Sequence, residues 1–209
     1  MDTIMIPHPT SRYLIAVLFI LALAGVSRAQ QMDAGFLGKR YAGAALFIEH
    51  LNSGDIGNGN GVELSGNAPL ASFLDASVQA SYEKFGNYSL KDKRLGASLT
   101  GYADLETWKP FAEIGFTNTA QSSSVSGIKY TNSENLCAFG VGVEAPVSKS
   151  TAVFGVVAFN RYFNDKIDSY WTYKFGVNAW VTPKLGAILS VSIWDGESST
   201  YSLGVMYRF

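Results

Sequence analysis

The ten residues Leu74-Asp-Ala-Ser-Val-Gln-Ala-Ser-Tyr-Glu83 alternate without exception between apolar and polar side chains. In an extended chain one face carries Leu74, Ala76, Val78, Ala80 and Tyr82, and the other carries Asp75, Ser77, Gln79, Ser81 and Glu83. A period of two is that of a β-strand, whereas a helical pattern repeats every 3.6 residues. The segment is therefore predicted to be a strand with one apolar and one polar face.

The same alternation recurs along the chain. It is clear at 94–104, 111–117, 136–145, 171–181, 185–193 and 201–209, and less regular at 39–50, 61–65 and 151–163, the last of which is apolar on both faces. Short proline-containing stretches and longer stretches rich in Gly, Asn and Ser separate these segments in turn, and both are typical turn sequences. The pattern predicts an all-β meander of ten antiparallel strands, or eight if the first hairpin is misassigned, with both termini at the end of the tight turns.

The N-terminus has the features of a secretory signal peptide. Arg12 precedes an uncharged apolar run of 14 residues, 13–26, and small residues follow at Ser27 and Ala29. A basic flank, an apolar core and a small-x-small site together predict cleavage between Ala29 and Gln30. A membrane anchor is the alternative. The expected organisation is a signal peptide at 1–29 and one β-barrel domain at 30–209.

Composition excludes several classes of protein. The 17 acidic and 16 basic residues nearly cancel, so no basic surface suggests nucleic acid. Charged residues make up 16% of the chain, against about 25% in an ordinary soluble domain. Cys137 is the single cysteine, so an internal disulfide framework is excluded. No motif predicts a cofactor or a metal site.

The apolar faces favour a membrane barrel over a soluble one. After residue 30 no apolar stretch is long enough for a helical span, but the apolar faces extend over about 8–10 residues, close to what a tilted strand needs to cross a bilayer. Strands can span lipid only as a closed barrel, because every backbone polar group must be paired within the protein. We therefore expect apolar side chains to face outward and polar ones inward, the reverse of a soluble barrel. Aromatic residues expected at the two membrane interfaces are Tyr82, Phe85, Trp108, Phe111, Tyr162, Tyr170 and Trp171.

The last nine residues, Tyr-Ser-Leu-Gly-Val-Met-Tyr-Arg-Phe, end the chain on an aromatic ring. With the signal peptide and the alternating strands, this ending resembles the small, porin-like outer-membrane β-barrel family of Gram-negative bacteria. The resemblance implies export through the periplasm, contact with outer-membrane lipid and lipopolysaccharide, and recognition by the outer-membrane assembly machinery. The assembly signal would comprise Tyr201, Leu203, Val205, Tyr207 and Phe209.

Charged residues on the polar faces are expected to lie in the lumen. They are Asp75, Glu83, Glu113, Glu144, Arg161, Lys174 and Arg208. Unpaired charges in a narrow lumen would be costly, so one hypothesis is a salt-bridged plug that only stabilises the barrel. The other is a narrow polar pore, which would make the protein a small passive channel.

Two further functions are weighed against these. Barrel proteases and lipid-modifying enzymes of the resembled class use a histidine base, and His50 is the one histidine in 30–209. By its phase His50 faces outward at the loop end, near Ser53 and Asp55, so no catalytic residue is predicted and we expect no enzyme. Surface adhesion through the Ser-rich stretch 121–135, predicted to be the longest loop, is the second alternative.

Overall fold

The computed structural model describes residues 34–52, 57–86, 90–125, 128–164, 166–195 and 198–209. The predicted signal peptide and its Ala29–Gln30 cleavage site lie outside these residues. In the described part of the chain, no helix is long and apolar enough to cross a membrane.

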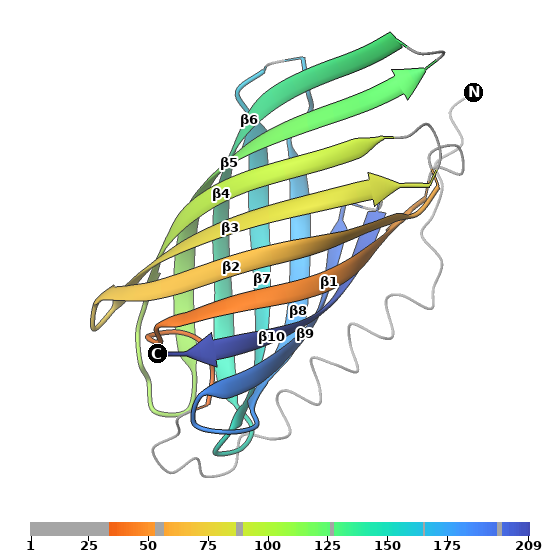
Figure 1. Cartoon of the computed structure of the whole chain (residues 1–209). Coiled ribbons are helices and arrows are strands. Elements are labelled where there is room, and N and C mark those ends of the chain that lie inside the picture. Colours follow the sequence, from red (N-terminus) through yellow and green to blue (C-terminus); the bar gives the residue numbers. More distant parts are fainter. Residues whose placement is uncertain (1–33, 53–56, 87–89, 126–127, 165, 196–197) are drawn as a thin grey trace.

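Ten strands form a closed antiparallel barrel (Figure 1). They are β1 (Tyr41–Leu51), β2 (Gly59–Ala71), β3 (Leu74–Phe85), β4 (Lys91–Tyr102), β5 (Lys109–Val125), β6 (Ile128–Pro146), β7 (Thr151–Tyr162), β8 (Tyr170–Trp180), β9 (Leu185–Trp194) and β10 (Ser198–Arg208). Each strand pairs with its neighbours in sequence, and β10 pairs with β1 along its whole length, so the C-terminal strand closes the barrel. The prediction of a ten-stranded up-and-down barrel is confirmed.

Two predicted connections are strands instead. The proline-containing stretch 67–70 belongs to β2, where the register with β3 shifts between Pro69 and Ala71. Proline lacks a backbone N–H, and such an irregularity is where a strand tolerates it. The predicted loop 121–135 is mostly a hairpin, in which β5 and β6 pair through to Val125 and Ile128. Figure 1 shows this hairpin extending beyond the neighbouring strands. Its polar composition, which suggested a loop, suits a β-ribbon with water on both faces.

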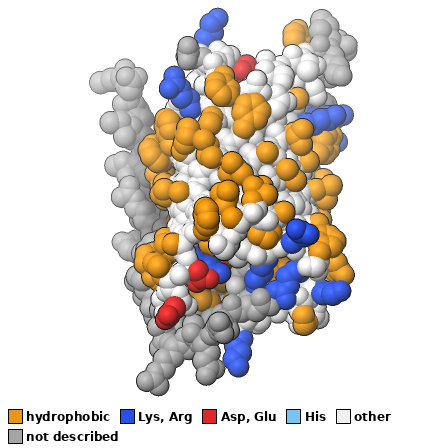
Figure 2. All heavy atoms as spheres, turned by 90° about the vertical axis from the view of Figure 1, so that its left-hand side faces the viewer, with side chains coloured by type: hydrophobic (Ala, Val, Ile, Leu, Met, Phe, Trp, Pro, Cys, Tyr) orange, Lys and Arg blue, Asp and Glu red, His pale blue; other side chains and the backbone are white. Residues whose placement is uncertain are grey.

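The outer surface is apolar and the interior is polar. Large hydrophobic side chains are exposed on every strand except β7, for example Leu46, Leu64, Val78, Leu95 and Val141. Figure 2 shows hydrophobic side chains spread over the middle of the barrel wall, with most charged ones toward its two ends. The largest fully buried side chains are Glu83, Glu144, Asn178, Asp75 and Asp92. This is the arrangement expected of a membrane barrel and the reverse of a soluble one.

Some of the predicted interfacial aromatic residues lie on the outside of the barrel wall, and the others face the lumen. Tyr82, Trp108 and Trp171 are exposed on the outside, as expected. The prediction was wrong for four others that face the lumen, namely Phe85, Phe111, Tyr162 and Tyr170. Phe85 and Phe111 lie on the same face as the inward-facing acids of their own strands, Glu83 and Glu113, so strict alternation predicts their direction better than their position near a turn.

Candidate functional site: two closures of the lumen

Six of the seven predicted lumen charges face the interior. Asp75, Glu83 and Glu144 are each only 1% exposed, and Glu113 accepts hydrogen bonds from the hydroxyls of Thr100 and Ser98 on the neighbouring strand at 3.2 and 3.4 Å. Lys174 lies opposite Ser192 and Val156 on the inner face of β8. Arg208 places its guanidinium 5.3 Å from the ring centroid of Trp180. These residues are distributed along the lumen, from the end of the tight turns to the end of the loops.

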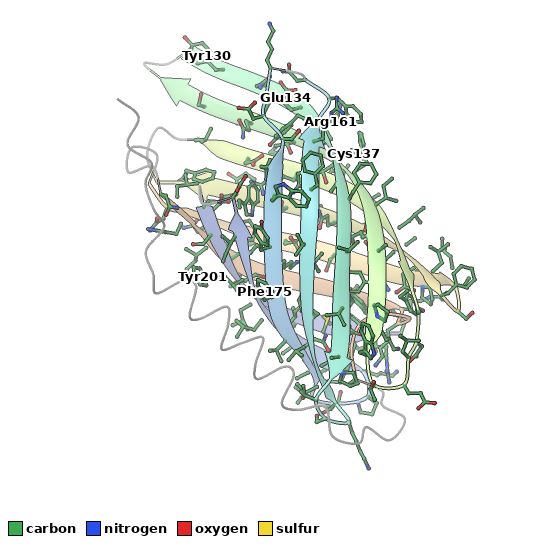
Figure 3. The ribbon with its side chains drawn as sticks, turned by 180° about the vertical axis from the view of Figure 1, so that it is seen from behind. Tyr130, Glu134, Cys137, Arg161, Phe175 and Tyr201 are labelled. Atoms are coloured by element: carbon green, nitrogen blue, oxygen red, sulfur yellow. The ribbon has the colours of Figure 1, made fainter. Side chains whose placement is uncertain are left out.

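Arg161 was wrongly predicted to face the lumen. It lies opposite Cys137, in phase with the pairs Phe159–Phe139 and Val157–Val141, and Phe139 and Val141 are exposed on the outer surface. Figure 3 shows Arg161 and Cys137 on adjacent strands toward the loop end. Because β7 is apolar on both faces, its sequence does not reveal its phase. The register with β6 decides it.

At the end of the tight turns, the segment Ala34–Lys39 folds into the barrel. We call this segment the N-terminal plug. The backbone N–H of Phe36 donates to Glu144 Oε2 at 2.7 Å, and that of Gly38 donates to Asp75 Oδ2 at 2.8 Å. Ala34 and Leu37 are buried. The two carboxylates therefore accept hydrogen bonds from backbone N–H groups of the plug.

Other strands hold the plug as well. The indole N–H of Trp180 donates to the carbonyl of Gly35 at 2.8 Å, and the ring of Phe36 meets that of Phe154 edge to face, with centroids 5.2 Å apart. Asn67 donates to the carbonyl of Lys39 at 2.8 Å. The plug thus contacts inward side chains from β2, β3, β6, β7 and β8 and crosses the lumen at this end.

Two glycines fit the plug to its site. Gly35 and Gly38 have φ angles of +92° and +77°, a region that side chains other than glycine rarely adopt. A Cβ at Gly35 would overlap the Glu144 carboxylate, and one at Gly38 would lie 2.8 Å from the Tyr102 hydroxyl. The plug was not predicted from the sequence. The sequence feature that could have indicated it is the stretch Ala-Gly-Phe-Leu-Gly-Lys, in which two large apolar residues lie between glycines just before the first strand.

At the loop end, Arg94 forms ion pairs with three buried carboxylates. Arg94 Nη2 lies 2.8 Å from Asp92 Oδ2, 3.4 Å from Glu83 Oε2 and 3.9 Å from Glu49 Oε2. Of the four residues, only Glu83 was among the predicted lumen charges. The alternation of their strands already placed Glu49 and Arg94 on inner faces. Among the described residues, no group of His, Cys, Asp and Glu side chains is arranged to hold a metal ion.

Arg94 also reaches across the bore. Its guanidinium carbon lies 4.9 Å from the ring centroid of Trp194 on β9, and four strands separate β4 from β9 in either direction around the barrel. Tyr170 stacks on Trp194 with centroids 5.4 Å apart, and Tyr162 lies 6.0 Å from Tyr170. Arg94, its carboxylates and these three rings form a second closure, which we call the Arg94 layer.

The outward-facing candidates lie apart from both closures. His50 is exposed, and its Nδ1 lies 2.7 Å from Asn58 Oδ1, whereas Ser53 and Asp55 lie outside the described residues. All five residues of the predicted assembly signal are exposed: Tyr201, Leu203, Val205 and Tyr207 on the outer face of the closing strand, and Phe209 directly after it. A polar recess of about 170 Å³ lies instead on the inner face of the extended β5–β6 hairpin, next to the Arg94 layer, with which it shares Tyr162; its other lining residues are Thr119, Gln121, Asn132, Glu134 and Ile167.

Comparison with known proteins supports the fold alone. No family model matches the sequence, and no curated protein is similar to it. Among solved structures, the β domain of the Bordetella autotransporter BrkA is similar over 82% of this chain and 99% of its own length, at 9% identity and a TM-score of 0.51. The translocator domain of the Neisseria meningitidis autotransporter NalP matches over 96% and 98%, at 13% identity and 0.48. Neisserial surface protein A matches over 81% and 96%, at 15% identity and 0.45. The protein is therefore a closed, ten-stranded antiparallel barrel that is similar in fold to this autotransporter β domain of Bordetella.

Proposed function

We propose that this protein is an integral outer-membrane barrel with a structural role, and that its lumen is closed in the resting state. The observation that carries the proposal is the presence of two closures, the N-terminal plug at the turn end and the Arg94 layer at the loop end. Outer-membrane lipid and lipopolysaccharide would surround the barrel, and the assembly machinery would recognise the residues from Tyr201 to Phe209.

The closures favour a structural barrel over an open, porin-like channel. An ion entering at the turn end would meet the plug, where Asp75 and Glu144 already accept backbone hydrogen bonds. An ion entering at the loop end would meet Arg94 bound to carboxylates on one side of the bore and to Trp194 on the other. Conduction would require both layers to move, so passive diffusion is expected to be negligible.

The four tryptophans test the membrane location. Trp108 and Trp171 are exposed on the outer wall, whereas Trp180 and Trp194 contact Lys39 and Arg94 in the lumen. Single-tryptophan variants of residues 30–209 would be refolded into vesicles whose acyl chains carry bromine near the headgroup. The fluorescence of a Trp171-only variant should be quenched strongly and that of a Trp180-only variant weakly. Equal quenching of the two would contradict insertion with the apolar wall against lipid.

Surface binding is a second candidate, favoured by the polar recess on the extended hairpin. Its lining of amide, hydroxyl, carboxylate and phenol groups could hydrogen-bond a polar ligand. Thr119 pairs with Glu134 across the ladder, so a two-residue turn could replace residues 120–133 without changing the register below. If cells that display the shortened barrel adhere as well as those with the full chain, surface binding through this hairpin is excluded.

An enzyme role remains testable at one position. His50→Ala would remove the only histidine of the barrel domain. Unchanged products in a lipid-modification assay would exclude His50 as an essential base, as we expect from its exposed position on the outer wall.

A further inference from the structure

Where β3 ends and β4 begins, charged side chains alternate between the lumen and the outer surface of the barrel. The sequence reads Glu83-Lys84 on one strand and Lys91-Asp92-Lys93-Arg94 on the other. By strand alternation Glu83, Asp92 and Arg94 face the lumen, where both carboxylates form ion pairs with Arg94. The same alternation places the three lysines on the outer surface, where all of them are exposed. We call Lys84, Lys91 and Lys93 the lysine patch.

The patch holds positive charge that its neighbours leave unbalanced. Lys84 lies directly opposite Lys91, and Lys93 lies opposite Tyr82. In the described part of the chain, no carboxylate forms an ion pair with any of the three lysines. Like charges facing each other across a β-ladder destabilise it. An anionic partner at this place would relieve that repulsion.

The depth of the patch on the wall indicates which partner fits. On the same two strands Val78 and Leu95 are exposed toward the middle of the barrel. Tyr82, two residues before Lys84 on the same face of β3, is also exposed. Tyrosine rings favour the level of lipid headgroups, and apolar side chains favour the acyl chains beneath. The lysine ammonium groups therefore lie where headgroup phosphates lie, on the side of the loops.

We propose that Lys84, Lys91 and Lys93 form a binding site for the phosphate groups of anionic lipids in the loop-side leaflet. The inference rests on the proposed membrane location, and it assigns the lipid contact to specific residues. A lipid fits better than a soluble anion because Leu95 and Val78 offer an apolar wall to its acyl chains, beside the ammonium groups. Two neutralised lysines should lower affinity roughly thirtyfold, because each lysine near an anionic surface contributes on the order of 1 kcal/mol.

The test uses a pair of double variants with the same change in charge. K84Q/K91Q neutralises the patch, whereas K149Q/K184Q neutralises two exposed lysines in the turns at the other end of the barrel. Each barrel, residues 30–209, is refolded in non-ionic detergent and titrated with dioleoylphosphatidic acid or dioleoylphosphatidylcholine, and bound lipid is counted by native mass spectrometry. Wild type and K149Q/K184Q should prefer the phosphatidic acid, and K84Q/K91Q should lose that preference.

Three results would overturn the proposal. One is undiminished binding by K84Q/K91Q, another is an equal loss in K149Q/K184Q, and the third is displacement of the lipid by inorganic phosphate at equal concentration. The variants change exposed side chains only, and a heat-modifiable shift in gel mobility verifies that each barrel is folded. The quenching experiment distinguishes this outcome from failure of the proposed membrane location. If the barrel does not insert, brominated lipid will not quench the fluorescence of the Trp171-only variant, whatever lipid the lysine variants bind.

A charge reversal supplies a second, independent measurement. Lys91→Glu would place a carboxylate opposite Lys84. In uncharged detergent this change should raise the urea midpoint of unfolding, because repulsion becomes attraction, yet it should weaken binding of phosphatidic acid. A fall in the midpoint together with unchanged lipid binding would contradict the repulsion on which the site depends.

Discussion

Glu144→Ala tests how the N-terminal plug is held. Glu144 is 1% exposed, and its Oε2 accepts the N–H of Phe36 at 2.7 Å. A hydrogen bond to a charged group contributes about 1.5–3 kcal/mol. Losing it should make release of the plug easier by about 2 kcal/mol, which is roughly thirtyfold in the opening equilibrium. The barrel itself should stay folded, because the strand ladders do not depend on this side chain.

Hydrogen–deuterium exchange measures this opening directly. The plug amides exchange only when the plug leaves its carboxylates, so exchange at Phe36 should accelerate roughly thirtyfold in Glu144→Ala. Glu63→Ala is the matched control, because Glu63 also faces the lumen but has no hydrogen bond with the plug. Exchange at Phe36 should remain at the wild-type rate in this variant.

The reasoning would be refuted by exchange at Phe36 that is unchanged in Glu144→Ala. The same holds if Glu63→Ala accelerates exchange equally, since a general loosening of the barrel would then explain both. Gly38 supplies an internal check within one experiment, because its N–H is held by Asp75 rather than Glu144. Its exchange should rise less than that of Phe36 unless the plug leaves as one unit.

Three further predictions concern the other end of the lumen, the indole contact and the C-terminus. Arg94→Gln leaves three buried carboxylates without their cation, so it should lower the free energy of unfolding in urea by about 3–5 kcal/mol. A decrease in this free energy of less than about 1 kcal/mol would show that the layer is not a charge cluster. Trp180→Phe removes one hydrogen bond to Gly35, so plug exchange should accelerate about fivefold, corresponding to about 1 kcal/mol. Unchanged exchange would remove Trp180 from the closure. Phe209→Ala, at an exposed ring, should leave refolding in detergent unchanged and reduce the amount of barrel in the outer-membrane fraction of cells. Equal amounts would argue against an assembly role for this residue.

Period-two alternation predicted the strands well because the barrel wall separates two environments. Where one face is apolar and the other polar, as at Leu74–Glu83, the sequence determines both the strand and the direction of each side chain. The same logic correctly placed Glu113 and Lys174 in the lumen. It failed at β7, where Val156 and Val157 are equally apolar and only pairing with β6 distinguishes the faces.

The closures were harder to predict because they depend on contacts between distant residues. Phe36 and Glu144 are 108 positions apart, and nothing in either local sequence indicates that a backbone N–H will satisfy that carboxylate. Arg94 meets Trp194 only because ten strands close into a ring that places β4 opposite β9. The extended hairpin was missed for a different reason. Outside the apolar zone, residues 121–135 show no hydrophobic alternation, although backbone pairing continues.

Single-channel recording from residues 30–209 in a planar bilayer tests the central claim most directly. With insertion verified by quenching of Trp171, the closed lumen predicts a baseline without discrete steps, because the N-terminal plug and the Arg94 layer both cross the bore. Reproducible steps of one size from the unmodified chain would contradict a structural barrel closed at both ends. They would show instead that the lumen conducts as a porin-like channel.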